Sequence, residues 1–518
     1  MRHLVAAIVL LLAGAASAQE LRIGVASEPT TMDPQFYNLT PNSETAAYVF
    51  DTLVWSDAEG KLIPWLAKSW RLVDERTWEF ALREGVTFHD GTPFTVDDVL
   101  ASFSRVPTVP NSPSNYAKFL SHIAQTEVLG PYTLRLVTTE PYPSLAADLT
   151  QIAIIPRRSQ SATSPEFNAG RAMVGTGPYK FVEWVPGDRI VYTRNDAFWG
   201  RKPAWERVVI KPLGNAAART AALLSRTVDL INQVPPEDLP TLQARPDIAI
   251  HQGPEIRLMY IAVDSTRDQS PFVTAKDGKQ LDPSPLRDPR VREAMSKALD
   301  RTALVDKLMN GQAVAAGDVQ PAGTLGTLPD AQPEAYDPAG ARRLLAEAGY
   351  PDGFAITIHG PNDRYLNDAK VVQAVAQFFS RVGIATKVET MPKSVYFTKV
   401  AKREFSVFLI GTTAILGTGT LSMQTYLFAT RDPAKLMGAG NWTYYSRPQV
   451  DALVAKALTT VDDGAREALL REAGRIVLLE RPILPLFFGT NSWAMRTTLD
   501  YPARVDSYTL AAEAVPVR

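Results

Sequence analysis

The chain has 518 residues, and its 54 lysines and arginines against 55 aspartates and glutamates leave a formal net charge of −1 at pH 7. This balance, without a long run of like charge, gives no electrostatic reason to expect nucleic acid or an anionic membrane surface as a partner. The absence of cysteine excludes disulfides, thiolate metal sites and cysteine catalysis. The length predicts more than one domain.

The N-terminus has the pattern of a secretory signal. Met1-Arg2-His3 is a short positive start, residues 4–13 are all apolar, and Ala16-Ser17-Ala18 has the small-x-small spacing of a cleavage site. We therefore expect residues 1–18 to be a signal peptide cleaved near Ala18, so that the mature protein is exported. A short N-terminal membrane anchor is the alternative.

The first half of the chain predicts many strands. Trp78, Phe80 and Leu82 alternate at period two, which indicates a strand over residues 77–82. Thr95 and Asp98 are spaced to cap a helix that starts after them. Further strands are expected over residues 21–26, 132–138, 180–184, 190–192 and 208–211.

The second half predicts alternating strands and helices. A strand over residues 354–359, a helix over 368–382 and a strand over 384–389 form a βαβ unit, which implies parallel pairing. The other expected elements are helices that start at Asp288-Pro289 and Asp337-Pro338, a strand over 405–410, helices over 448–458 and 465–479, and a buried strand over 483–488 that returns to the first half.

These elements predict two α/β lobes. We expect lobe 1 to comprise residues 19–257 and lobe 2 residues 258–481, with residues 482–518 rejoining lobe 1. A chain that crosses twice between two lobes makes a hinge, and ligands favour the cleft that such a hinge closes.

Several segments resemble the signature of the family 5 extracellular solute-binding proteins, the dipeptide, oligopeptide and nickel-type receptors of ABC importers. They are residues 66–70 (LAKSW), 77–80 (TWEF), 82–95 (LREGVTFHDGTPFT), 175–179 (GTGPY), 195–199 (NDAFW), 228–231 (VDLI) and 288–292 (DPRVR). The resemblance implies a type II periplasmic-binding-protein fold in its large form, with an extra subdomain in lobe 1. These residues are turns, caps and aromatics, so they indicate the fold rather than the ligand.

The same resemblance implies a function. A member of this family closes over a solute and delivers it to an ABC permease in the inner membrane. We expect the ligand to be a peptide or a peptide-like small solute, and we expect the receptor to be a monomer that needs no cofactor. A signalling role through a chemoreceptor stays open.

Arg364 is the first candidate for ligand binding. It lies just before the helix expected at Asp368, close to where dipeptide receptors of the family place an arginine for the peptide carboxylate. A guanidinium group is always charged and can hold a carboxylate with two parallel hydrogen bonds. The alternative is a surface arginine near a helix start.

The loop that follows the strand at 405–410 departs from the family. Dipeptide receptors have an aspartate there for the free amine of the peptide, whereas this loop offers the hydroxyls of Thr412, Thr413 and Thr418. Such a loop favours an anion or a hydroxyl-rich group. Glu28, in the loop after the first strand, is a candidate for pairing with an amine, with a solvated glutamate as the alternative.

The remaining candidates lie in two loops. Tyr37 and Asn38 follow Glu28 in a loop that lines the cleft in the family, and Asn441, Trp442 and Tyr444 lie in an aromatic-rich loop before the helix at 448. We expect Trp442 either to stack on the ligand or to anchor its loop against lobe 2.

Little in the sequence indicates an enzyme. Outside the predicted signal the histidines are His89, His122, His251 and His359, and none has the spacing of a helical zinc motif. No nucleophile elbow or Walker sequence is present. The alternatives kept open are a receptor for a non-peptide ligand, such as an organic anion, a glycoside or a nickel chelate, and a periplasmic hydrolase with a pair of carboxylates.

Overall fold

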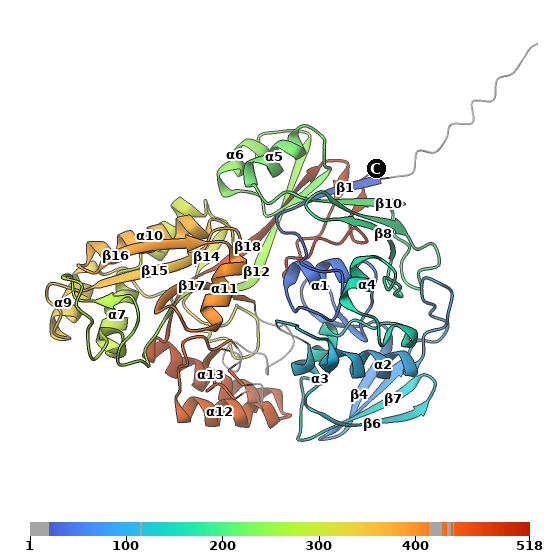
Figure 1. Ribbon diagram of the computed structural model, residues 1–518, viewed down its shortest axis with the longest axis horizontal. Helices are drawn as coiled ribbons and strands as arrows, with labels where there is room; N and C mark the ends of the chain where they lie inside the picture. Colours follow the sequence, from blue (N-terminus) through green and yellow to red (C-terminus); the bar gives the residue numbers. More distant parts are fainter. Residues whose placement is uncertain (1–19, 114–115, 414–426, 433–436, 439, 518) are drawn as a thin grey trace, which may run out of the picture.

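The computed structural model describes residues 20–113, 116–413, 427–432, 437–438 and 440–517, and it shows two α/β lobes that share one sheet (Figure 1). In the described part of the chain this sheet has twelve strands. Its main path is β13 (Val273–Thr274), β15 (Ala355–Pro361), β17 (Val407–Thr413), β12 (Ile248–Val263), β18 (Ile483–Arg496), β11 (Leu230–Asn232), β1 (Glu20–Val25), β10 (Arg207–Pro212), β9 (Arg189–Arg194) and β8 (Tyr179–Val185). Off this path, β14 (Ala313–Ala315) pairs with β18 and β16 (Ala385–Met391) pairs with β15.

The antiparallel pair β12–β18 connects the lobes. Its register runs from Ile248 opposite Arg496 to Ala262 opposite Ile483. At the Arg496 end β18 pairs with β11 of lobe 1, and at the other end β12 pairs with β17 of lobe 2. The expected return of the chain after residue 482 therefore occurs through β18, which extends eight residues beyond the predicted strand end at 488. The predicted lobe limits fall on β12 and just before β18.

A separate four-stranded sheet makes the extra subdomain of lobe 1. Its order is β4 (Ala67–Asp74), β5 (Thr77–Leu82), β7 (Thr133–Thr138) and β6 (Ile123–Gly130), and α2 (Val96–Arg105) lies against it in Figure 1. Phe80 of β5 and Val99 of α2 belong to the same buried cluster. Residues of β5 alternate in burial as the period-two pattern predicts, and Thr95 with Asp98 forms the predicted capping box of α2.

Lobe 2 contains the predicted βαβ unit. β15, α10 (Asp368–Arg381) and β16 follow one another, and β15 and β16 pair in parallel. Asp288 and Asp337 accept backbone N–H groups as the N-caps of α7 (Pro289–Lys297) and α9 (Pro338–Glu347). The last two helices are α12 (Pro448–Thr459) and α13 (Asp463–Glu480). Among the described residues, no helix is both long enough and apolar enough to cross a bilayer.

The smaller elements complete the two lobes. They are α1 (Thr40–Ala46), β2 (Val54–Ser56), β3 (Leu62–Pro64), α3 (Leu145–Asp148), α4 (Ser164–Asn168), α5 (Ala216–Leu224), α6 (Leu239–Gln243), α8 (Arg301–Ala303), α11 (Lys393–Ala401), β19 (Leu499–Asp500) and β20 (Val515–Pro516). The short helix α1 matters most for the site, because its residues Thr40 and Ser43 line the inter-lobe pocket described below.

The glycine-rich segment at residues 175–179 packs against the backbone of lobe 1. The N–H of Gly177 donates to the carbonyl of Val49 at 2.9 Å, and the hydroxyl of Thr176 donates to the buried carboxylate of Asp51 at 2.7 Å. An added Cβ at Gly177 would lie 2.7 Å from the Val49 carbonyl carbon and 3.0 Å from the Tyr48 carbonyl oxygen. This part of the family signature is therefore structural, as expected.

We predict that Gly177→Ala destabilises the protein by about 2 kcal/mol or more, because its methyl group meets rigid backbone rather than a mobile side chain. Gly130→Ala is the matched control, since nothing lies within 4 Å of a Cβ built at Gly130. Urea unfolding of both variants measures the difference. Equal stability of the two variants would contradict this account of the motif.

His359 on β15 is a buried, neutral histidine. Its ring stacks on Phe405 with centroids 4.0 Å apart and meets the edge of Phe272 at 4.7 Å. Burial lowers the pKa of His359 to about 4, although the Glu389 carboxylate, 3.5 Å from Nε2, acts in the opposite direction. The unfolded chain therefore takes up this proton at a higher pH than the folded protein does.

We predict that the free energy of unfolding decreases as the pH falls from about 6.5 toward 4, with His359 accounting for up to roughly 3 kcal/mol of the loss. The comparison with His359→Leu isolates this contribution from that of the other titratable groups. Chemical denaturation at a series of pH values should show a shallower pH dependence in the variant. The same dependence in both proteins would refute the assignment.

Candidate ligand-binding site

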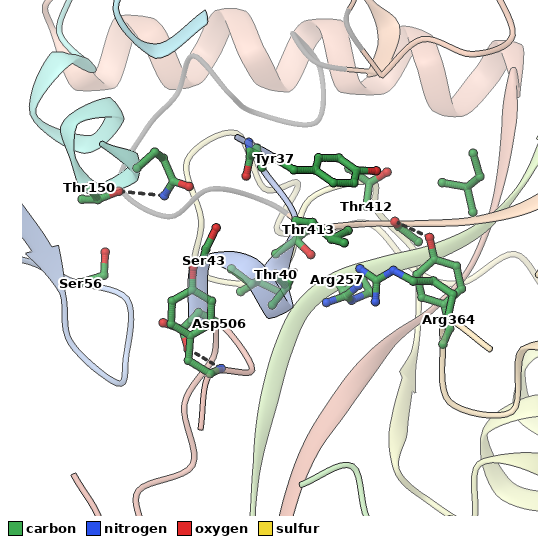
Figure 2. Close-up of a pocket in the computed structure, with 18 of the residues that line it drawn as sticks. Tyr37, Thr40, Ser43, Ser56, Thr150, Arg257, Arg364, Thr412, Thr413 and Asp506 are labelled. Carbon is green, nitrogen blue, oxygen red and sulfur yellow. Dashed lines mark hydrogen bonds between the residues drawn. The ribbon is translucent and has the colours of Figure 1, made fainter. Parts of the chain in front are cut away.

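A pocket of about 300 Å³ lies between the two lobes. This size is at the lower end of the range for small-molecule sites. Its lobe 1 wall consists of Tyr37, Asn38, Leu39, Thr40, Ser43, Trp55, Ser56, Gly60, Lys118, Thr150, Gln151, Asp506 and Tyr508. The opposite wall consists of Ile256 and Arg257 of β12 with Arg364, Tyr365, Phe397, Ile410, Gly411, Thr412, Thr413 and Trp442. Figure 2 shows Ser43 and Asp506 on one side of the pocket and Arg257 and Arg364 on the other.

Arg364 contributes a positive charge that forms no ion pair with a described protein group. It lies in the loop between β15 and α10, where the Asp368 carboxylate accepts the backbone N–H groups of Arg364 and Tyr365 at 2.9 and 3.0 Å. Within the described residues, its guanidinium group has no carboxylate or hydrogen-bond acceptor within bonding distance. Burial and then the neighbouring Arg257 lower the pKa of Arg364 from its ordinary value. The group therefore favours an anionic ligand atom.

Arg257, on the strand that joins the lobes, lies beside Arg364. Its Nε donates to the Glu255 carboxylate at 2.6 Å, and the same carboxylate oxygen accepts the Ser507 hydroxyl at 3.1 Å. Burial acts to lower the pKa of Arg257, but the attraction of Glu255 outweighs it and the pKa is raised. This end of the pocket thus has two guanidinium groups and one carboxylate, and its net charge is positive.

The lobe 1 wall contains the acidic side chain that lines the pocket, Asp506. Asp506 accepts Nε of the fully buried Arg504 at 3.0 Å and the backbone N–H of Tyr508 at 3.0 Å. Arg504 also binds the Glu513 carboxylate at 2.6 Å, so it is shared between two acids. Near this wall, burial raises the pKa of Glu44 to about 8, which leaves that carboxyl group mostly protonated at pH 7.

Another part of the lobe 1 wall is formed by Lys118, Thr150 and Gln151. Burial lowers the pKa of Lys118 to about 8, although the nearby Asp148 carboxylate acts to raise it. The side-chain amide of Gln151 donates to the Thr150 hydroxyl at 3.0 Å. This region therefore presents polar donors and acceptors on the side of the pocket away from Arg364, as Figure 2 shows for Thr150.

Six of the residues predicted from the sequence line the pocket: Arg364, Tyr37, Asn38, Thr412, Thr413 and Trp442. The hydroxyl of Thr412 is within 3.1 Å of the Tyr260 hydroxyl, so part of its hydrogen-bonding capacity is already used. Thr418 lies outside the described residues.

Glu28 was predicted to bind ligand, but the structure places it elsewhere. Its carboxylate accepts the indole N–H of Trp184 at 3.1 Å and the backbone N–H of Gly187 at 2.8 Å, and it does not line the pocket. Gly187 lies in the turn between β8 and β9, so Glu28 joins that hairpin to the start of lobe 1.

Asn441 and Tyr444 are also placed away from the pocket lining. Asn441 is buried, and its side chain donates to the carbonyls of Ala429 and Tyr445 and accepts the N–H of Tyr445. The ring of Tyr444 lies 3.8 Å from the guanidinium carbon of Arg403. Asn441 is thus held by backbone groups around its own loop, and Tyr444 packs against Arg403 from the segment between α11 and β17.

Several residues that line the pocket were not predicted from the sequence. Arg257 had a sequence signal, since it interrupts the apolar run of residues 256–263. Ser43, Lys118 and Asp506 had none, because they come from distant segments that only the fold brings together. Among the described residues, no group of three or more histidines, aspartates or glutamates is arranged to hold a metal ion.

Comparison with known proteins identifies the family. Residues 61–434 match the family described as bacterial extracellular solute-binding proteins, family 5 Middle. The chain belongs to this family. As a family 5 protein it is a solute-binding protein and not a hydrolase, which confirms that part of the expectation.

Its relatives agree with this assignment. The glutathione-binding protein GsiB of Escherichia coli (strain K12) is 29% identical over 478 residues, which are 91% of this chain and 89% of that protein. The fold is similar to that of the periplasmic binding protein DppA from Helicobacter pylori in complex with peptide STSA, with a TM-score of 0.82, 22% identity and coverage of 96% and 98% of the two chains. The fold is also similar to that of NikZ from Campylobacter jejuni in complex with Ni(L-His), with a TM-score of 0.81, 22% identity and coverage of 96% of this chain and 99% of that chain. The two-lobed fold class is confirmed.

Proposed function

We propose that this protein captures a small peptide or peptide-like solute through a free carboxylate and delivers it to an ABC permease in the inner membrane. The observation that supports this proposal is the half-buried guanidinium group of Arg364, which lines the pocket and has no ion pair or hydrogen bond among the described residues. A charge that is partly removed from water is unfavourable until it is paired, so a ligand carboxylate is the group that this end of the pocket favours.

The size and polarity of the pocket agree with a peptide. A volume of about 300 Å³ suits a ligand of two or three residues better than a long peptide. Lys118, Thr150 and Gln151 offer polar contacts on the far side, and Asp506 is an acid for a ligand amine. Glutathione, the ligand after which the GsiB relatives are named, is a tripeptide with two carboxylates and one amine.

A non-peptide anion is the second candidate. Thr412 and Thr413, which were expected in a loop, are the last two residues of β17, and they offer hydroxyls to the pocket where dipeptide receptors have an aspartate. NikZ was solved with Ni(L-His). A nickel chelate with a carboxylate would also pair with Arg364. A neutral glycoside would leave this charge unbalanced, so we place it behind both.

We further propose that residues 1–18, which lie outside the described residues, are removed during export and that the mature protein is a periplasmic monomer with no affinity for nucleic acid. We propose lobe limits at 19–257, 258–481 and 482–518, because β12 and β18 are the two connections. Intact-mass spectrometry of protein from the periplasm should give a chain that starts at Gln19. A mass that includes residues 1–18 would show an uncleaved anchor.

We predict that at least one member of a defined panel raises the melting temperature of the wild-type protein, because a ligand that binds the native state stabilises it. The panel is reduced glutathione, a dipeptide and tripeptide library, and Ni(L-His). Arg364→Ala should weaken binding roughly 10- to 100-fold, since it removes charge-assisted hydrogen bonds worth about 1.5–3 kcal/mol. Thermal shift assays and calorimetry measure both effects.

The matched control is Arg343→Ala, which removes an exposed arginine of the same lobe that has only a loose ion pair of 3.9 Å with Glu347. It should bind like the wild type. Equal affinity of Arg364→Ala and Arg343→Ala for every binding panel member would exclude the proposed role of Arg364.

A further inference from the structure

We propose that Arg257 is a second carboxylate-binding residue, so that the ligand carboxylate lies between two guanidinium groups and the pocket discriminates acids from amides. This inference rests on the proposed function and identifies the group that sets its specificity. Arg257 was not among the residues expected from the sequence, and it lies on the hinge strand β12 rather than on a ligand-binding loop.

Arg257 and Arg364 both lie near the ring of Tyr365. The guanidinium carbons of Arg257 and Arg364 lie 5.8 and 5.0 Å from the centroid of the Tyr365 ring. The Tyr365 hydroxyl donates to the carbonyl of Gly411 at 3.1 Å, which fixes the ring. A cation near an aromatic face is attracted by the ring quadrupole, so Tyr365 stabilises each guanidinium group against the repulsion between them.

Gly411 on β17 leaves the space for this arrangement. A Cβ built at Gly411 would lie 2.9 Å from Cε1 of Tyr365 and 3.1 Å from Cδ of Arg257. Both contacts are closer than ordinary van der Waals packing. The absence of a side chain at residue 411 thus lets the Arg257 side chain and the Tyr365 ring occupy the same wall of the pocket.

The hydrogen bonds of Arg257 leave its outer donors available. Its Nε is used by Glu255, and in the described part of the chain neither Nη atom donates a hydrogen bond. Together Arg257, Arg364 and Glu255 have one net positive charge. One ligand carboxylate would balance this charge and accept from both guanidinium groups, whereas an amide would leave it unbalanced.

A bulge in the pairing of β12 with β18 lies at Arg257. Pro254 pairs with Thr490 and Leu258 pairs with Phe488, so residues 255–257 lie opposite Gly489 alone. Such a bulge bends a strand and redirects its side chains. A Cβ built at Gly489 would clash with the Glu255 carboxylate, so the glycine leaves room for this side chain. Arg257, the proposed carboxylate-binding residue, is therefore part of the connection between the lobes.

The test compares Arg257→Ala, Arg257→Lys and the wild type with two probes. The probes are one dipeptide library with free C-terminal carboxylates and the same library with C-terminal amides. Half-maximal thermal-shift concentrations give the ratio of acid to amide affinity. We expect Arg257→Ala to lower the affinity for acids at least ten-fold and that for amides less than two-fold. Arg257→Lys should lower the affinity for acids several-fold without changing that for amides, because lysine keeps the charge but not the paired donors.

Each outcome decides a separate question. Equal losses for acids and amides would show that Arg257 only supports the structure, and unchanged acid binding would show that Arg364 acts alone; both overturn the inference and leave the proposed function standing. Failure of the wild type to bind either library, together with the glutathione and tripeptides of the panel above, would refute the peptide function itself. If Arg257→Ala does not fold, Arg257→Lys and Arg257→Gln provide the same comparison.

Discussion

The antiparallel pairing of β12 with β18 is the constraint on which the rest of the structure depends. These two strands belong to both lobes, because β11 of lobe 1 and β17 of lobe 2 pair at opposite ends of them. They set the distance between the two walls of the pocket. The bulge at residues 255–257 interrupts their register at the pocket itself, so the connection between the lobes and the wall of the pocket share residues.

The electrostatics of the pocket follow from this placement. Arg257 is paired with Glu255 and Asp506 with Arg504, so each is largely balanced by the protein. Lys118 has Asp148 nearby. Arg364 has no such partner in the described part of the chain, although its guanidinium group is half-buried in the pocket wall. A carboxylate is the ligand group that balances this charge, whereas a neutral ligand would have to bind against it.

Much of the fold was predictable, because local signals agreed with the tertiary structure. The alternation in β5, the capping box of α2 and the βαβ unit around α10 all formed where the sequence indicated them. The resemblance to the family also led to Arg364. Glu28 and Asn441 lie outside the pocket lining, which the sequence could not indicate because residue type reveals hydrogen-bonding capacity but not its partner. Lys118 and Asp506 gave no signal, since they meet only after folding.

The central claim is that a ligand carboxylate balances the charge of Arg364 with the help of Arg257. A crystal structure of the protein with a panel ligand that binds, or with a solute that co-purifies in the pocket, tests this claim most directly. The account predicts a carboxylate within hydrogen-bonding distance of both guanidinium groups. An occupant that has no anionic group near Arg364, or one that binds outside the inter-lobe pocket, would contradict it.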